Sequence, residues 1–240
     1  MRAVDPYAWS WDPEALLLFP AMTAAYLLAL RRYAAPGWRI ACFLGAMGLL
    51  LAVSITPIDT IALQYLLSVH LLQNVVLAEW APALAVLGIP PALAALAPRV
   101  PLLPALGLWV ANYALWHLPW LYDTALRHPQ SLLHLEHALY FGTGVLLWWP
   151  VVHGAHPPGA KAAYLFAGFL LASPIGLVLA LVPEPIYGFY ADGPGLWGLS
   201  ALTDQQIAGV TMAVEQAVVF FAAFALFFAR FFAEQDAVAG

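Results

Sequence analysis

Residues 161–182 read KAAYLFAGFLLASPIGLVLALV, a run whose single charged residue, Lys161, stands at its start. At a rise of about 1.5 Å per residue, a helix of this length crosses the roughly 30 Å hydrocarbon core of a bilayer. Backbone groups in lipid must be paired within their own segment, and this run lacks the two-residue alternation of a barrel strand. The stretch therefore predicts a transmembrane helix.

Six further apolar runs lie along the chain, separated by breaks that are rich in turn residues or in charge. They cover approximately residues 14–30, 38–55, 61–87, 104–118, 131–151 and 203–232. The run 104–118 is crowded by prolines at both ends, which predicts a short or tilted helix. Together the seven runs predict an all-α, polytopic transmembrane helix bundle of about seven spans, with residues 1–240 forming a single domain.

The composition indicates lipid as the surrounding solvent. Of the 240 residues, 64% are hydrophobic and 9% are charged, against about 25% charged in ordinary soluble domains. The net charge is −5 with eight Lys and Arg, so there is no basic stripe for nucleic acid. Cys42 is the single cysteine, which excludes an internal disulfide or thiolate cluster. Any metal site must therefore use His, Met, Asp or Glu.

The basic residues near the ends of the runs predict the orientation in the membrane. With the N-terminus outside, the outer side receives Arg2 and Arg127. The inner side then receives Arg31, Arg32, Arg39, Arg99, Lys161 and Arg230. This asymmetry predicts an external N-terminus and a cytoplasmic C-terminus. Residues 1–14 are acidic rather than cationic, so the first run is expected to be a retained span, and residues 234–240 are expected to be frayed.

Polar side chains inside membrane spans are costly and therefore mark candidate functional sites. His70 lies nine residues beyond Ile61, where its run enters from the outer side, or roughly 14 Å along a helix. By the same arithmetic, Met212 lies at a similar depth beyond Thr203, and Glu215 lies about one turn deeper. The outer half of the bundle is thus expected to contain a polar cluster.

Three more histidines lie at the predicted outer ends of helices. His134 and His137 are three residues apart, so their Cβ atoms are expected about 5–6 Å apart on one face, where they can share a metal or face water. His117 ends its run, and Asp123 follows in the next loop. Imidazole suits copper, zinc and iron, whereas thioether favours Cu(I). These residues predict a metal site that opens to the outer side, made of His70, His117, His134, His137 and Met212, in which the thioether favours copper.

The same residues also have structural interpretations. His70 can hydrogen-bond a neighbouring helix, and His117 can bond the free carbonyl groups at its helix end. Met212 can pack in the core, and Glu215 can be neutral and buried or relay protons. Asp123 or Glu136 can orient the imidazoles by accepting a hydrogen bond from the ring nitrogen that does not bind the metal.

Four ordered blocks of the sequence resemble the CtaG-type cytochrome c oxidase assembly factors, which are seven-span bacterial membrane proteins. The most specific block is residues 115–151, LWHLPWLYDTALRHPQSLLHLEHALYFGTGVLLWWPV, with WH-x-P-x-LYD-x-AL, H-x-EH and WWPV in order. The other blocks are Trp11-Asp12-Pro13 with the APALAVLGIP run of residues 81–90, Pro185-Ile186-Tyr187 with Tyr190, and Asp204-Gln205-Gln206-x-Ala208-Gly209-x-x-Met212.

The resemblance implies a non-enzymatic, multi-pass protein of the bacterial inner membrane. Such a protein helps to mature a haem–copper oxidase by supplying copper from the outer side, in contact with an oxidase subunit. The resemblance implies a metal site at the family's polar positions, which fall on His70, His117, Asp123, His134, His137 and Met212. One position departs, because the family shows H-M-x-Q-H where this chain has His70-Leu71-Leu72-Gln73-Asn74. Asn74 thus replaces a second imidazole, and an amide oxygen is a poor ligand for soft Cu(I).

Two other functions are compatible with the sequence. Two of the histidines can serve as axial ligands of a b-type haem in a membrane oxidoreductase. Alternatively, Gln205, Glu215 and Gln216 can line the path of a small-solute or ion transporter. The chain has no Walker loop, serine-hydrolase elbow or metalloprotease helix motif, so it is not expected to be an NTPase or hydrolase. A homo-oligomer is left open.

Overall fold

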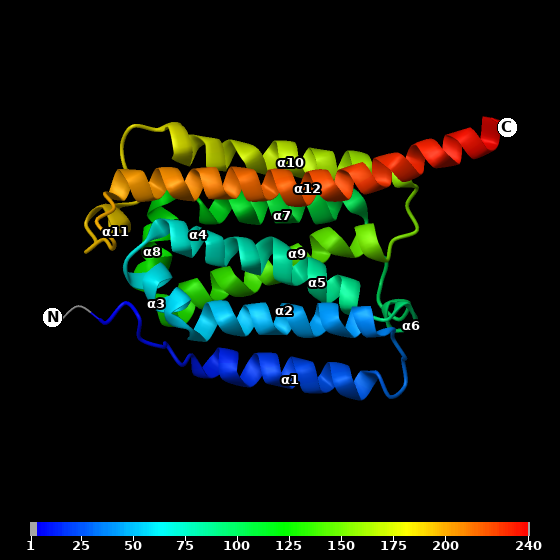
Figure 1. The fold of residues 1–240 in the computed structure, drawn as a ribbon, viewed down its shortest axis with the longest axis horizontal. Coiled ribbons are helices and arrows are strands. Elements are labelled where there is room, and N and C mark those ends of the chain that lie inside the picture. The colour runs from blue at the N-terminus through cyan, green and yellow to red at the C-terminus, as the bar shows by residue number, and fades with distance from the viewer. Residues whose placement is uncertain (1–3, 240) are drawn as a thin grey trace.

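The computed structural model describes residues 4–239, and every regular element in this range is a helix. The long helices lie side by side along one direction, with the N-terminus at one end of the bundle and the C-terminus at the other (Figure 1). The elements are α1 (Pro13–Ala29), α2 (Gly37–Ile55), α3 (Pro57–Gln64), α4 (Leu67–Val75), η1 (Val76–Trp80), α5 (Ala81–Gly88), α6 (Pro91–Ala94), α7 (Leu102–Trp116), α8 (Pro119–Arg127), η2 (Pro129–Leu133), α9 (His134–Val152), α10 (Pro158–Leu181), α11 (Gly188–Ala191) and α12 (Ala201–Ala239).

Each predicted apolar run contains a long helix or a stack of helices. Four segments are long and apolar enough to cross a membrane, namely Gly37–Ile55, Leu67–Gly88, Pro158–Leu181 and Ala201–Ala237. Helices α1 and α7 are apolar but shorter, and α7 is the short helix predicted for residues 104–118. The count of seven spans and the orientation stay predictions, and Arg2 lies outside the described residues.

Local sequence explains where most helices begin. Proline occupies the first turn of α1, α3, α8 and α10, where its missing N–H is not needed for the helix. Asp12 caps α1, because its Oδ1 accepts a hydrogen bond from the Glu14 N–H at 2.7 Å. Such signals act within a few residues, so they are available before any tertiary packing.

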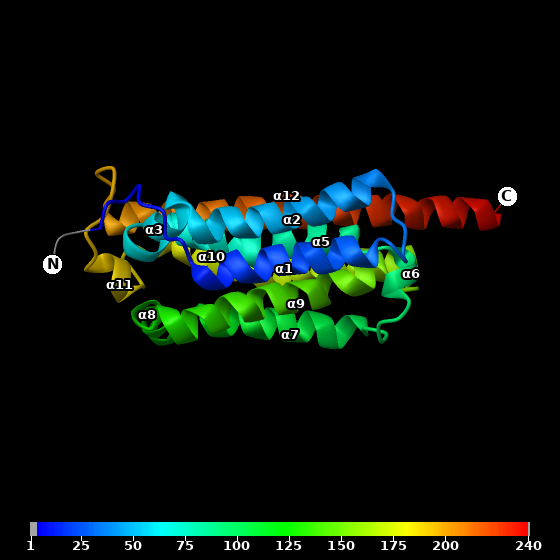
Figure 2. The ribbon, with the colours of Figure 1, turned by 90° about the horizontal axis from the view of Figure 1, so that it is seen from below.

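The segment made of α4, η1 and α5 is the centre of the bundle. Seventy-two per cent of its apolar window is buried, against 22–33% for the other three spanning candidates. Helices α2 and α9 pack against α5, and α12 packs against α4 (Figures 1 and 2). A central helix contacts protein rather than lipid, so it can carry polar side chains within the span.

The run predicted as one helix over residues 61–87 is broken at Tyr65 and Leu66. Asp204 of α12 caps the new start of α4: its Oδ2 accepts from the Leu67 N–H at 2.6 Å, and its Oδ1 accepts from the Ser68 N–H at 3.2 Å. The single continuous helix expected from Ile61 is therefore wrong, and the depth of His70 in the membrane stays a prediction. His70 lies three residues into α4, or about 4.5 Å along its axis.

Helices α10 and α12 approach closely through glycine. A Cβ atom on Gly209 would lie 2.4 Å from the Ala180 amide nitrogen and 2.5 Å from the Gly176 carbonyl oxygen, so only glycine fits there. Helix α12 has 39 residues, about 58 Å at 1.5 Å per residue, and extends beyond the bundle at the C-terminal end (Figure 1). The tail predicted as frayed is thus helical to Ala239, and Gly240 lies outside the described residues.

Candidate functional site at the N-terminal end of the bundle

His70 is fully buried in the first turn of α4. Its Nδ1 atom lies 2.9 Å from the hydroxyl oxygens of both Tyr122 and Tyr190. The Tyr190 hydroxyl donates its own hydrogen to the Ala62 carbonyl oxygen at 2.6 Å, so its contact with His70 is a hydrogen bond in the tautomer that carries hydrogen on Nδ1. The Nε2 atom of the neutral ring then has a free lone pair, and it is buried without a hydrogen-bond partner among the described residues.

The tautomer of His117 is set by a single carbonyl group. It is the C-cap of α7, and its Nδ1 lies 2.8 Å from the Tyr113 carbonyl oxygen, which can only accept. The predicted bond to a free helix-end carbonyl is therefore confirmed. Its Nε2 is also buried without a partner in the described part of the chain. His117 thus presents a second free imidazole lone pair inside the protein.

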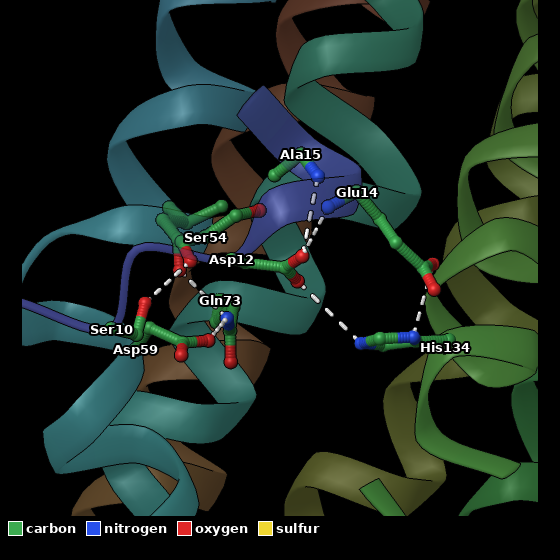
Figure 3. A network of polar contacts seen from close by, with 9 residues as sticks. Ser10, Asp12, Glu14, Ala15, Ser54, Asp59, Gln73 and His134 are labelled. Carbon is green, nitrogen blue, oxygen red and sulfur yellow. Dashed lines mark hydrogen bonds and ion pairs between the residues drawn. The ribbon is translucent and has the colours of Figure 1, made fainter. Parts of the chain in front are cut away.

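His134 and His137 occupy the first turn of α9, as their spacing predicts. Figure 3 shows His134 between two carboxylates: its Nδ1 lies 3.1 Å from Glu14 Oε2, and its Nε2 lies 3.5 Å from Asp12 Oδ2. The ring centre of His137 lies 6.2 Å from that of His70 on α4. His137 therefore connects the carboxylate-flanked His134 to the buried His70.

Two cavities adjoin this histidine pair. The larger, of about 240 Å³, is lined by polar residues together with Met22 and apolar side chains of α1, α2 and α9. The smaller, of about 150 Å³, lies toward α3. Both are lined by Asp12, Ser54, His134 and His137. His134 and His137 are therefore accessible to a small ion from a cavity.

Sequence reasoning missed three residues of this site, Asp12, Glu14 and Met22. The Trp11-Asp12-Pro13 block predicts a helix start, because Asp before Pro is a typical N-cap. It does not predict that the same carboxylate also contacts a histidine. Asp12 uses Oδ1 to cap α1 and presents Oδ2 to His134. Met22 supplies a thioether to the larger cavity.

Two of the predicted ligands are engaged elsewhere in the described structure. Met212 is buried on α12 and packs beside Gly176 of α10, as in its structural interpretation. Asp123 accepts a hydrogen bond from the Phe189 N–H at 3.2 Å and so holds α11. Within residues 4–239, no group of three or more His, Cys, Asp or Glu side chains is placed to hold one metal ion. The ligand roles of these residues stay predictions.

Asn74, which stands where the resembled family has histidine, joins two helices. Its Nδ2 donates to Glu136 Oε1 of α9 at 3.2 Å, and both side chains are buried. The recorded partner of Glu136 is thus an amide and not an imidazole. The position links α4 to α9 without contributing a soft ligand.

Asp59 on α3 lines the smaller cavity. Its Oδ1 accepts from Gln73 Nε2 at 2.9 Å (Figure 3). Burial raises the pKa of Asp59 from its ordinary 3.8 to about 6, although the hydrogen bond from Gln73 opposes this shift. The protonated form is therefore favoured by the folded state.

Replacing Asp59 by Asn is expected to raise stability above pH 6 by at most about 2 kcal/mol, allowing for partial exposure, since one pKa unit corresponds to about 1.4 kcal/mol. In the wild type, the folded state keeps a proton that the unfolded state has lost, so the free energy of unfolding falls as pH rises from about 4 to about 6. Thermal unfolding in detergent between pH 4 and pH 8 measures this. If the melting temperature of Asp59→Asn depends on pH as that of the wild type does, the proposed proton uptake by Asp59 is contradicted. Asp192→Asn, at an exposed acid, is the control.

A known protein family matches most of the chain. The family model for the cytochrome c oxidase caa3 assembly factor, Caa3_CtaG, matches residues 24–234. No curated protein and no solved structure matches the chain. The matched residues include all four predicted histidines, whereas Asp12, Glu14 and Met22 precede them.

Proposed function

This chain belongs to the cytochrome c oxidase caa3 assembly factor family, and from that premise we propose that it is a non-enzymatic membrane protein that binds Cu(I) as cargo and delivers it to a haem–copper oxidase. The residues proposed to receive the ion are His134 and His137 at the two cavities, with His70 behind them.

The observation that carries this proposal is the state of the buried imidazoles. His70, His117 and His137 each have an Nε2 that is buried without a hydrogen-bond partner in the described residues. Such an atom costs about 1–3 kcal/mol, so its retention calls for an explanation. His117 also donates Nδ1–H to a carbonyl oxygen, as metal-binding histidines generally do, and His70 Nδ1 lies 2.9 Å from two tyrosine hydroxyl oxygens. A metal ion at Nε2 would satisfy these lone pairs.

The ligand types favour copper in its reduced form. Imidazole nitrogen together with the Met22 thioether suits Cu(I) better than a hard cation. Asp12 and Glu14 place negative charge beside the cavity, which attracts a cation from water. We therefore propose that the ion first meets His134 and then passes to His137 and His70, whose ring centres lie 6.2 Å apart.

The basic residues support the proposed direction of delivery. Arg31, Arg39 and Lys161 lie near the end of the bundle opposite the histidines, and the positive-inside rule places that end in the cytoplasm. The cavities would then open on the outer side of a bacterial inner membrane. An oxidase subunit docked at that end is the proposed recipient.

Copper binding can be tested on the purified full chain by titrating Cu(I) against a competing chelator. The double variant His134→Ala/His137→Ala is expected to weaken binding by at least about tenfold, since it removes both imidazoles at the cavities. His128→Ala is the matched control, because His128 is an exposed histidine at the same end. Equal affinity in the double variant and the wild type would exclude the proposed site.

The same variants separate copper delivery from a purely structural role in assembly. In cells that lack this protein, the wild type and His128→Ala are expected to restore the copper content and activity of the oxidase. The double variant is expected to restore neither unless copper is added in excess. Full restoration by the double variant without added copper would contradict delivery through these histidines.

A further inference from the structure

A second polar cluster lies inside the bundle, on the part of the central segment away from the histidines. Glu79 belongs to the π-helical turn η1, and Glu215 and Gln216 belong to α12. Glu79 and Gln216 are fully buried, and Glu215 is 8% exposed. Two acids in the middle of a spanning bundle are costly, so their neighbours decide what charge they hold.

Each of the two carboxyl groups has one oxygen with a donor and one without. Gln216 Nε2 donates to Glu79 Oε1 at 3.2 Å, and Trp80 Nε1 donates to Glu215 Oε1. The other oxygens, Glu79 Oε2 and Glu215 Oε2, are buried without a hydrogen-bond partner among the described residues. Gln216 follows Glu215 in the chain and Trp80 follows Glu79, so the two hydrogen bonds cross between η1 and α12 and bring both carboxyl groups to one interface.

Two ionised carboxylates at this interface leave their unpartnered oxygens without any donor, because a carboxylate only accepts. They would also repel one another in a medium of low dielectric constant. A single proton on one carboxyl group provides the missing donor and removes the repulsion. We propose that Glu79 and Glu215 form an intramembrane site that together binds one exchangeable proton.

Among the described residues, no cationic side chain forms an ion pair with Glu79 or Glu215. The polar group that faces the pair from α7 is the Tyr113 hydroxyl, which accepts from Gln216 Nε2 at 2.9 Å. Arg39 of α2 donates to the Leu87 carbonyl oxygen, eight residues beyond Glu79 or about 12 Å along the helix. Lys161 of α10 lies over the Phe227 ring near the far end of the bundle. None of these contacts neutralises the pair.

Glu215 also lines a groove between α4, η1 and α12. The other lining residues are Thr211 and apolar side chains, namely Leu72, Trp80, Val210, Val214, Val218 and Val219. Such a lining offers few donors to the unpartnered carboxyl oxygens, which leaves a shared proton as the simplest way to satisfy them. Through this groove Glu215 is reached from the surface of the bundle at a place away from the histidines.

Infrared spectroscopy of the full chain in lipid nanodiscs tests this site, because a protonated carboxyl group and a carboxylate absorb separately. At neutral pH, the difference between the wild type and Glu79→Gln/Glu215→Gln is expected to contain one protonated carboxyl group and one carboxylate. Two protonated groups, or none, would overturn the shared proton. Glu184→Gln, at an exposed acid, is the control and is expected to remove one carboxylate only.

A cation exchange and a second variant complete this test. Exchanging Na⁺ for K⁺ at constant pH is expected to leave the wild-type spectrum unchanged, and a shift would show that a metal cation occupies the site instead. If the double variant does not fold, Glu136→Gln removes the other fully buried glutamate. A protonated carboxyl band must remain in that variant, and its absence would overturn the proposal. No copper is added, so the result is independent of the proposed copper site.

Discussion

Replacing Gly144 by Ala is expected to destabilise the protein by more than about 3 kcal/mol, as an overpacked core does in severe cases. A Cβ atom on Gly144 would lie 2.3 Å from the Ala78 carbonyl oxygen and 2.6 Å from Pro82 Cγ, both on the central segment. Neither backbone nor a proline ring can move aside cheaply. Helix α9 would therefore be displaced from η1 and α5, and His137 would move away from His70.

Gly142 of the same helix is a matched control for Gly144. A Cβ atom there meets nothing within 4 Å, so Gly142→Ala is expected to stabilise α9 by up to about 1 kcal/mol through helix propensity. Thermal unfolding in detergent and Cu(I) titration measure both variants. Equal melting temperatures for the two variants would show that the close approach of α9 to the central segment is not required.

Replacing Asp204 by Asn is expected to cost more than about 3 kcal/mol, because hydrogen bonds to a charged group are worth about 1.5–3 kcal/mol each. The carboxylate accepts from the Leu67 N–H with one oxygen and from the N–H and hydroxyl of Ser68 with the other. An amide keeps the shape but replaces one acceptor by a donor, which then faces a backbone N–H. The start of α4 would lose its cap three residues before His70.

The control for Asp204 is Asp192→Asn, an exposed acid in the preceding loop that is expected to leave stability within about 0.5 kcal/mol of the wild type. Thermal unfolding reports the loss of the cap, and Cu(I) titration reports whether His70 keeps its position. A wild-type melting temperature in Asp204→Asn would show that α4 begins at Leu67 without this carboxylate.

The positions of most helices were predictable because their causes are local. Helix α2 covers Gly37–Ile55 where residues 38–55 are predicted, and α10 covers Pro158–Leu181 where residues 161–182 are predicted. Lipid demands long apolar segments, and proline sets where they begin. The pairing of His134 with His137 was predictable for the same reason, since three residues of helix place them on one face.

The break before α4 has no such local cause. Tyr65 and Leu66 are ordinary apolar residues in an apolar run, and Asp204, which stabilises the new helix start, is 137 residues away from Leu67 in the chain. Likewise, Asp12 and Glu14 face His134 because of how the N-terminal segment packs against α9. The packing of α12 also sets Met212, a predicted ligand, beside Gly176 of α10.

The amino-acid sequence is thus enough to predict a helical membrane bundle, the places of its long helices, and the histidines that share a helix face. These properties follow from apolar length, proline placement and helical periodicity, which act within one segment. Tertiary packing alone brings His137 to His70, the N-terminal acids to His134, and Glu79 to the same interface as Glu215. Those contacts join different helices, and they depend on close approaches such as that at Gly144, whose geometry no single segment contains.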